Sequence, residues 1–380
     1  MIPDLQPSKI REMHGLAGPD SVNLGLGQPV LDLPPEFINV VNRVMREDDL
    51  GYTGYAGLPE LREAIANRVC GKSGTGDNVS ITVGTTEGLF ATLLTLLQPD
   101  DEVLIPDPGF VLYEAVIKIV GGQPVTYPVY SSNDFDLHVD DITERITSRT
   151  RAIVLNSPNN PTGRIIKRAQ LEQLADIAAS HDLYIISDEV YDTIDYTGEF
   201  TSAWGLTDKT IVLGGASKTF AMTGWRLGWV IGDLDIMSKI NIAHHYMVAC
   251  APAIAQRVMA RLLTGDGDIG ETVRQQYQDE YIRRRQTMLD AIHTDLPEWE
   301  YITPEGAFYL MLKIPENLLA TAGSSEQFAR DLITSQDTVT IPGSAFGNEG
   351  EGYVRLSFAV TPDTIREGIS RMAQYEKEMS

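Results

Sequence analysis

A single lysine, Lys218, lies in a sequence context that is unusual for a solvated charge. It follows the apolar run 210–213 and sits in the segment Gly214-Gly215-Ala216-Ser217-Lys218-Thr219, with Arg226 eight positions further on. A buried strand that delivers a lysine into a loop of small residues places it to form an imine with an aldehyde cofactor. The small neighbours leave room for a ring and a phosphate, and Arg226 would bind that phosphate through two hydrogen bonds.

Two more polar groups follow expected strands. Asp188 comes two positions after the apolar run 183–186, and Asn160 lies in the turn-rich segment 156–163 behind another apolar run. Asp188 would keep a heterocyclic ring nitrogen protonated, and Asn160 would hydrogen-bond a phenolate-like oxygen of the same ring. The simpler alternatives are a helix N-cap or a loop acid for Asp188 and an ordinary turn for the asparagine.

Three further segments fit parts of a binding site. Gly84-Thr85-Thr86-Glu87 joins an expected strand to a helix; free N–H groups and two hydroxyls there favour phosphate, although the same residues form a capping arrangement. Phe110 would stack on a ring or belong to the core. Arg355, on an alternating strand, would grip a carboxylate in two hydrogen bonds or lie on the solvent face of an edge strand.

The elements that must position these residues alternate from about residue 78. Short apolar strands are separated by segments with helical spacing, and the strands are expected at 79–83, 103–105, 124–126, 152–155, 183–186 and 210–213. This pattern predicts an α/β fold with a mainly parallel sheet covered by helices on both faces. Ligands of such sheets bind beyond the carboxyl ends of the strands, just where these motifs fall. A charged helix at 271–295 would lead into a second, smaller domain.

Composition limits the partners and the compartment. The chain has 380 residues, a net charge of -23 and a pI near 4.6, which argues against nucleic acid or an anionic membrane as a partner. Its two cysteines, Cys70 and Cys250, belong to no CxxC pattern, and its histidines have no metal-ligand spacing. We therefore expect no metal site and no disulfide framework. Without a signal peptide or an apolar stretch of about 18 residues, a cytoplasmic protein is expected.

Together these segments resemble the class I and II aminotransferases, which are pyridoxal-phosphate enzymes of fold type I. The matching segments occur in the family's order and are 52–61, 159–163, 188–191, 217–226, 304–309 and 342–347. The resemblance implies a seven-stranded type of mainly parallel sheet in a large cofactor-binding domain at 46–280. It also implies a smaller α+β domain at 281–380, to which an N-terminal segment, residues 1–45, would contribute.

The resemblance also implies roles around the cofactor ring. Lys218 would carry the covalently bound cofactor and move the proton between the substrate Cα and the cofactor. Asp188 would pair with the pyridine nitrogen, while Asn160 and Tyr191 would hydrogen-bond the phenolic oxygen. Phe110 would stack on the ring. Lys218, Asp188 and Tyr191 are the expected catalytic residues.

Other roles concern the phosphate and the substrate. The phosphate would be held by Thr85, Thr86, Ser217 and Arg226. Tyr52 would reach the phosphate of a neighbouring subunit, so the active site would exist only in a homodimer. Arg355 would bind the α-carboxylate, with the backbone of Gly27 and the side chain of Asn160 beside it. Gly215 departs from the family, where a hydroxyl residue often contacts phosphate, and this hydrogen bond would be missing or replaced by water.

The implied reaction is ping-pong transamination between an L-amino acid and a 2-oxo acid, with 2-oxoglutarate as one acceptor. The amino donor stays open. The segment 73–117 has neither Lys nor Arg, which weakens an aspartate-specific interpretation and leaves a neutral or aromatic donor equally open. One alternative is β-elimination, as in a C–S lyase, on the same scaffold. Another is a ligand-sensing regulatory domain, against which the acidic charge and a fold beginning by Asn23 both argue.

Overall fold

The computed structural model describes residues 5, 7–265 and 268–379. Its central feature is a seven-stranded sheet with the order β2-β8-β7-β6-β5-β3-β4. The strands are β2 (Val79–Thr82), β3 (Glu102–Asp107), β4 (Gln123–Pro128), β5 (Thr150–Asn156), β6 (Tyr184–Asp188), β7 (Thr210–Gly215) and β8 (Gly228–Ile231). Only β8 runs antiparallel to its neighbours. The predicted α/β fold with a mainly parallel sheet is confirmed.

Strand β8 is the one member of this sheet that the sequence did not predict. It has four residues, begins with Gly228 and follows closely on the loop that carries Arg226. Such a short run gives little periodicity to separate it from the loop before it. All four residues are nevertheless buried, because β8 lies between β2 and β7 inside the sheet.

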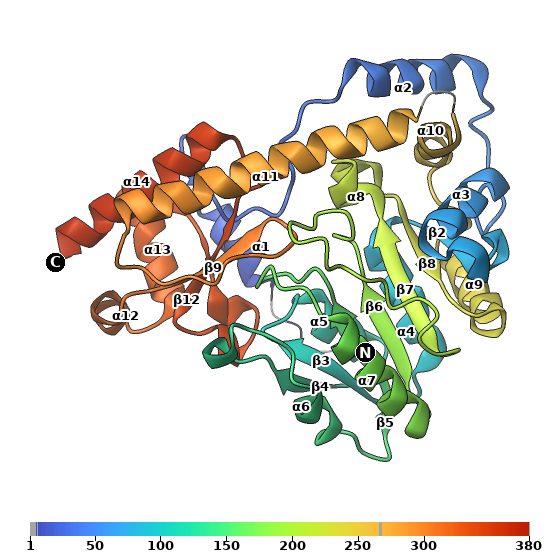
Figure 1. Cartoon of the computed structure of the whole chain (residues 1–380), viewed down its shortest axis with the longest axis horizontal. Coiled ribbons are helices and arrows are strands. Elements are labelled where there is room, and N and C mark those ends of the chain that lie inside the picture. The colour runs from blue at the N-terminus through green and yellow to red at the C-terminus, as the bar shows by residue number, and fades with distance from the viewer. Residues whose placement is uncertain (1–4, 6, 266–267, 380) are drawn as a thin grey trace.

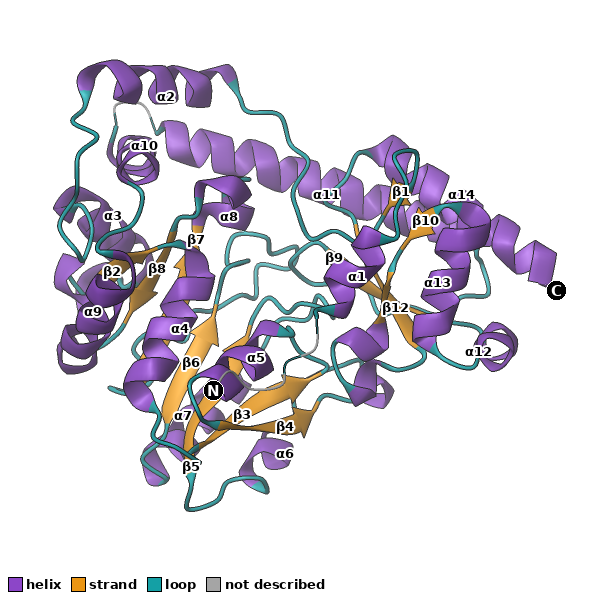
Figure 2. Ribbon diagram, turned by 180° about the vertical axis from the view of Figure 1, so that it is seen from behind, coloured by secondary structure: helices purple, strands orange, loops and turns teal. Residues whose placement is uncertain are grey.

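Helices cover both faces of the sheet (Figures 1 and 2). On one face, Val103 and Ile105 of β3 share a buried apolar cluster with residues of α4, α5 and α9. On the other face, Leu104 of the same strand packs in a cluster with residues of α6 and α7. Successive residues of β3 thus enter opposite cores, so the strand is apolar almost throughout, as expected for a strand buried on both faces.

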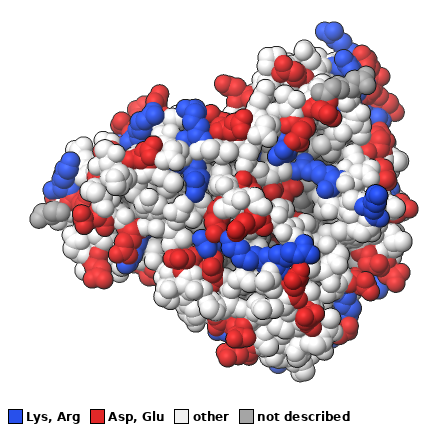
Figure 3. Space-filling model, viewed as in Figure 1, with Lys and Arg blue, Asp and Glu red and all other residues white. Residues whose placement is uncertain are grey.

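The helices have the following bounds. They are α1 (Lys9–Gly15), α2 (Pro35–Glu47), α3 (Pro59–Val69), α4 (Gly84–Leu96), α5 (Leu112–Ile119), α6 (Val139–Thr143), α7 (Arg168–Ser180), α8 (Ala216–Thr219), α9 (Leu234–Val248), α10 (Ala253–Thr264), α11 (Ile269–Asp295), α12 (Glu316–Ala322), α13 (Ser325–Gln336) and α14 (Pro362–Met379). Among the described residues, none of these helices combines the length and the apolarity needed to cross a membrane. Acidic and basic side chains are interspersed over the face shown in Figure 3.

A second, smaller sheet lies apart from the first in the order β11-β12-β9. It is antiparallel and consists of β9 (Tyr309–Lys313), β11 (Ile341–Pro342) and β12 (Tyr353–Ser357). Two short parallel strands, β1 (Val22–Asn23) and β10 (Thr338–Val339), join the N-terminal segment to this region. Because β12 is the middle strand and Arg355 is 1% exposed, the solvent-face interpretation of this arginine is wrong.

The long helix α11 extends from the region of the large sheet to the region of the small one, where it packs along α14 (Figure 1). The expected boundary between residues 280 and 281 falls inside this unbroken helix. The division into 46–280 and 281–380, with 1–45 joined to the latter, stays a prediction.

Candidate active site

The candidate site forms where β5, β6 and β7 reach the same edge of the large sheet. The strands are in register there, since Asn156 pairs with Asp188 and Asp188 pairs with Leu213. Helix α8 begins directly after β7 and carries Lys218. The parallel register therefore brings the predicted lysine, the predicted acid and the 156–163 loop to one place, beyond the carboxyl ends of the strands.

Lys218 is held by the N-terminal segment and sits in a positively charged environment. Its Nζ donates a hydrogen bond of 2.7 Å to the carbonyl oxygen of Gly27. Burial, followed by the nearby charges of Arg355 and Arg226, lowers the pKa of Lys218 to about 8, while Asp188 opposes this shift. A substantial fraction of neutral amine is therefore present near pH 8, which a nucleophile or a proton acceptor requires.

Asp188 is a buried acid held by neutral donors. Tyr113 donates from its hydroxyl to Oδ2 at 2.8 Å, and the backbone N–H of Val190 donates to Oδ1 at 3.3 Å. Burial raises the pKa of Asp188 to about 6, although both hydrogen bonds and Lys218 act in the opposite direction. A protonated ring nitrogen at this carboxylate would supply the cationic partner that a buried anion needs. The residues after it form a turn, so the helix N-cap alternative is wrong.

Asn160 is fixed by a neighbour that the sequence analysis did not single out. Its backbone N–H donates to Oδ1 of Asn156 at 2.8 Å, and Nδ2 of Asn156 donates to the backbone carbonyl of Asp188 at 2.9 Å. Oδ1 of Asn160 accepts a hydrogen bond of 2.8 Å from Nη1 of Arg355. Because its oxygen is used in this way, the amide has only its N–H groups to offer to a ligand oxygen.

Arg355 reaches the site from the small sheet. Its Nη2 donates to the carbonyl oxygen of Gly25 at 2.6 Å, and its buried Nε has no hydrogen-bond partner among the described residues. The guanidinium carbon lies 4.3 Å from the ring centre of Tyr309 and 4.8 Å from that of Phe346. Arginine between two aromatic rings keeps its charge while its plane stays fixed, which suits recognition of a carboxylate.

The phosphate-binding residues predicted from the sequence lie at the start of α4 and next to α8. Gly84 has a φ of +72°, a backbone conformation that favours glycine, and the end of the Arg226 side chain lies directly beside it. The hydroxyl of Thr85 donates to the carbonyl of Gly214 at 3.1 Å. Thr86 and Arg226 are exposed and Ser217 is buried.

Gly215, where the family often has a hydroxyl residue, has little room for a side chain. A Cβ there would lie 2.7 Å from the hydroxyl oxygen of Thr85. The capping interpretation of the adjacent segment is correct only in part, because Val83 is the N-cap of α4 and no side-chain capping bond forms there. Glu87 accepts a hydrogen bond of 3.1 Å from the backbone N–H of Val83, a donor that precedes the helix, so this contact is compatible with a phosphate at the first turn.

Two predicted residues lie at the margin of this cluster. Phe110 is half-buried and meets Tyr113 edge-on, with ring centres 5.9 Å apart, so it is close to the partner of Asp188. Tyr52 is 93% exposed, and within one chain it does not join the other predicted residues.

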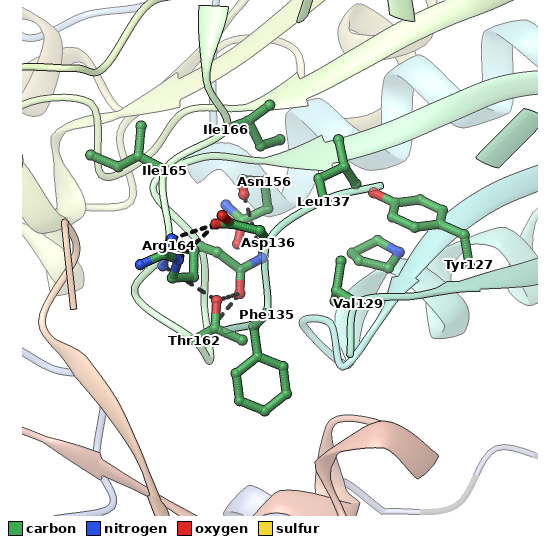
Figure 4. A pocket seen from close by; sticks show the side chains of 12 residues that line it. Tyr127, Val129, Phe135, Asp136, Leu137, Asn156, Thr162, Arg164, Ile165 and Ile166 are labelled. Carbon is green, nitrogen blue, oxygen red and sulfur yellow. Dashed lines mark hydrogen bonds and ion pairs between the residues drawn. The ribbon is translucent and has the colours of Figure 1, made fainter. Parts of the chain in front are cut away.

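A small cavity of about 30 Å³ lies behind the 156–163 loop (Figure 4). Arg164 and Asp136, which line it, form an ion pair, and Asn156 and Asn159 also belong to its wall. A volume of this size holds little more than one water molecule. Because Lys218 is absent from its wall, this cavity is separate from the candidate site.

Three neighbours of the predicted residues were missed. Asn156 begins the turn-rich segment 156–163, and Tyr309 ends the matched segment 304–309, so the sequence carries a signal for both. Tyr113 left none, because one tyrosine on an apolar helix is ordinarily a core residue. Among the described residues, no group of three or more His, Cys, Asp or Glu side chains is arranged to bind a metal ion.

Comparison with known proteins gives a consistent result. The family model "Aminotransferase class I and II" matches residues 19–372. An aromatic-amino-acid aminotransferase 2 from Thermococcus litoralis is 36% identical, with 98% of this chain and 97% of the relative covered. An aspartate aminotransferase from Pyrococcus abyssi is 35% identical over the same shares. The crystal structure of an aromatic aminotransferase from Pyrococcus horikoshii superimposes with a TM-score of 0.88 at 32% identity, covering 98% of this chain and 100% of that one.

Proposed function

Because the chain belongs to the class I and II aminotransferases and is a transaminase, we propose that Lys218 and its neighbours hold pyridoxal 5′-phosphate and move an α-amino group between an L-amino acid and a 2-oxo acid. The observation that carries this proposal is the environment of Lys218. A lysine whose pKa is lowered to about 8 lies in one site with a buried acid and a buried arginine.

When bound, pyridoxal phosphate supplies an aldehyde for the amino group and a ring that accepts electrons. The chain has a group for each part of this cofactor. Asp188 is a buried carboxylate suited to a protonated ring nitrogen, and the N–H groups of Asn160 are suited to the phenolic oxygen. Arg226, beside the glycine-lined N-terminus of α4, is suited to the phosphate.

Lys218 carries the proton in the proposed reaction. Its pKa of about 8 means that the neutral, proton-accepting form increases as the pH rises through that value. Burial and the charges of Arg355 and Arg226 are the cause, and they act on any free amine at this position. Because an ordinary lysine has a pKa near 10.4, this site provides a far larger fraction of usable base near neutral pH.

Arg355 binds and orients the substrate carboxylate. Each of its two Nη atoms uses one N–H on the protein, toward Asn160 and Gly25 respectively, and has a second N–H for the carboxylate. The burial of the guanidinium strengthens such hydrogen bonds, since little water competes for it. We propose 2-oxoglutarate as one acceptor, and the names of the relatives indicate an aromatic amino acid or aspartate as donor.

The site is proposed to be completed by a second copy of the chain. Tyr52 is almost fully exposed, and Tyr55, Ile242 and Tyr246 are exposed large side chains on neighbouring elements. Exposed apolar groups of this kind are typical of a surface that is covered in an oligomer. In a homodimer Tyr52 would reach the phosphate bound by its partner, as the family resemblance implies.

A half-reaction screen tests this function. Each of the twenty amino acids is added without an acceptor to the cofactor-loaded protein, and the change in visible absorption is timed. We expect conversion by at least one amino acid, with release of the matching 2-oxo acid in an amount equal to the enzyme. Continuous release of ammonia and pyruvate would instead show β-elimination, which the relatives' names do not favour.

A further inference from the structure

Tyr309 lies where three predicted site residues meet, yet the proposed function gives it no task. It begins β9 and pairs with Ser357 of β12, two positions from Arg355. Its side chain is 2% exposed. Its hydroxyl oxygen lies 2.9 Å from that of Tyr191, and its ring faces the guanidinium of Arg355 at 4.3 Å.

The main chain around Tyr309 is shaped to admit its hydroxyl. A Cβ on Gly27 would lie 2.1 Å from the hydroxyl oxygen of Tyr309, so only glycine fits at position 27. The carbonyl of that same glycine accepts the hydrogen bond from Lys218. Gly27 therefore has a structural reason to be glycine, independent of any contact between its backbone and a substrate.

We infer that Tyr309 is a positioning residue that couples the two halves of the site: its hydroxyl donates to Tyr191, and its ring seats Arg355. This inference rests on the proposed function and on the role that the family resemblance implies for Tyr191, whose hydroxyl would donate its proton to the phenolic oxygen of the cofactor. A hydroxyl that accepts one hydrogen bond becomes a better donor in the next. Tyr309 thus strengthens the hydrogen bond from Tyr191 to that oxygen without touching the cofactor.

The charges around the two hydroxyls favour Tyr309 as the donor. Burial raises the pKa of both tyrosines and the charge of Arg355 opposes this for both, but the nearby carboxylate of Asp188 raises the pKa of Tyr191 further. Of two hydroxyls in contact, the one with the more weakly held proton is the better donor. Tyr191 is then the acceptor, and its own O–H is directed away from Tyr309.

The test separates the hydroxyl of Tyr309 from its ring. Tyr309→Phe removes only the hydroxyl, and Tyr309→Leu removes both groups. In the cofactor-loaded protein, the visible absorption changes with pH as the proton at the bond between the cofactor and Lys218 is lost. The midpoint of this titration reports how tightly that proton is held. Weaker donation to the phenolic oxygen leaves more negative charge there and holds that proton more tightly, so the midpoint moves to higher pH.

For Tyr309→Phe we expect an upward shift of about 0.1–0.7 pH units, smaller than the shift in Tyr191→Phe, with KM for the amino acid within about twofold. Tyr309→Leu should show the same shift together with a KM raised by about 2- to 30-fold, since the ring contact with Arg355 is lost. Incorporation of 3-fluorotyrosine at position 309, a stronger donor, should move the midpoint to lower pH.

Tyr127→Phe is the matched control, because Tyr127 is also buried and its hydroxyl donates to the backbone carbonyl of Val154 at 2.8 Å instead of to a side chain of the site. It should titrate as the wild type does. The inference is overturned if Tyr309→Phe shifts no more than Tyr127→Phe, or if fluorotyrosine raises the midpoint. A wild-type protein that gains no visible absorption with pyridoxal phosphate contradicts the proposed function instead, before any variant is compared.

Discussion

The two ends of the candidate site differ in how far one chain completes them. At the inner end, formed by Lys218, Asp188, Asn160, Tyr191 and Arg355, nearly every polar group is buried and has a partner within the chain. At the end proposed to bind the phosphate, which comprises Thr85, Thr86, Ser217 and Arg226, both Thr86 and the arginine are exposed. Tyr52, which we propose completes this end in the partner subunit, is exposed as well.

This difference indicates that the two ends of the site serve different functions. The inner end is rigid and desolvated, so pKa values there are shifted and small displacements are costly. The phosphate end is open to water, where charge screening weakens each contact. We therefore expect substitutions at the inner end to change the chemistry, and those at the phosphate end to change cofactor affinity.

The largest effect is expected for Lys218→Ala. Loss of the group that carries the proton should reduce turnover by roughly 10²- to 10⁴-fold or more, and the visible absorption of the loaded protein should disappear. Lys209→Ala is the control, since Lys209 forms an ion pair with Asp182 near the surface. Full turnover in the Lys218 variant, measured by 2-oxo acid release, contradicts the assignment.

Asp188→Asn probes the cost of burying a charge at the inner end. The folded-state pKa of about 6 exceeds the ordinary value of 3.8, so the folded protein binds more protons between these two pH values and loses stability as the pH rises through them. In cofactor-free protein the variant lacks this loss. The free energy of unfolding of the variant, minus that of the wild type, should therefore be larger at pH 7.5 than at pH 4. The expected increase is on the order of 2–3 kcal/mol.

Chemical denaturation at both pH values measures that difference, and equal differences at pH 4 and 7.5 would argue against a buried, destabilising carboxylate. In the loaded enzyme the same variant should lose turnover, because a neutral amide cannot hold the ring nitrogen protonated.

Arg355→Ala should raise KM for the amino acid and for the 2-oxo acid alike. Hydrogen bonds to a charged group contribute about 1.5–3 kcal/mol, which corresponds to roughly 10- to 150-fold. Arg355→Lys keeps the charge but loses the planar pair of donors, and it should restore only part of the affinity. Steady-state kinetics with both substrates measure this, and an effect confined to one of them is incompatible with a shared carboxylate site.

Tyr52→Phe moves to the phosphate end and should weaken cofactor affinity by about tenfold while sparing the chemistry. Mixed dimers show whether Tyr52 contacts the phosphate bound by its own subunit or by the partner. A subunit with Tyr52→Phe and an intact Lys218 should regain normal affinity when its partner carries Lys218→Ala and an intact Tyr52. Without recovery in the mixed dimer, each tyrosine would serve its own subunit or none.

The smallest effect is expected for Gly215→Ser. The new hydroxyl would supply the phosphate contact that relatives often have at this position, but its Cβ would crowd the Thr85 hydroxyl at 2.7 Å. Because one contact is gained as another is displaced, cofactor affinity should stay within about threefold of the wild type. Equilibrium titration with pyridoxal phosphate measures the cofactor affinity. A gain above tenfold would show that the Thr85 hydroxyl does not replace the phosphate contact that relatives make at position 215.

The sequence predicted the positions that follow a strand better than those that depend on packing. Asp188, Asn160 and Lys218 come after three parallel strands, so strand order alone brings them to one edge. Tyr113 meets Asp188 across 75 residues and Tyr191 meets Tyr309 across 118. No local pattern encodes such contacts, because they arise only when helix α5 and the small sheet pack against the large one.

The most direct test of the central claim, that Lys218 binds the cofactor covalently, is chemical trapping. Cofactor-loaded protein is reduced with borohydride, which converts an imine into a stable amine, and is then digested and analysed by mass spectrometry. We predict one modified peptide, with the cofactor attached at Lys218. Attachment at any other lysine, or an unmodified Lys218 in protein that shows the visible absorption, would contradict the account.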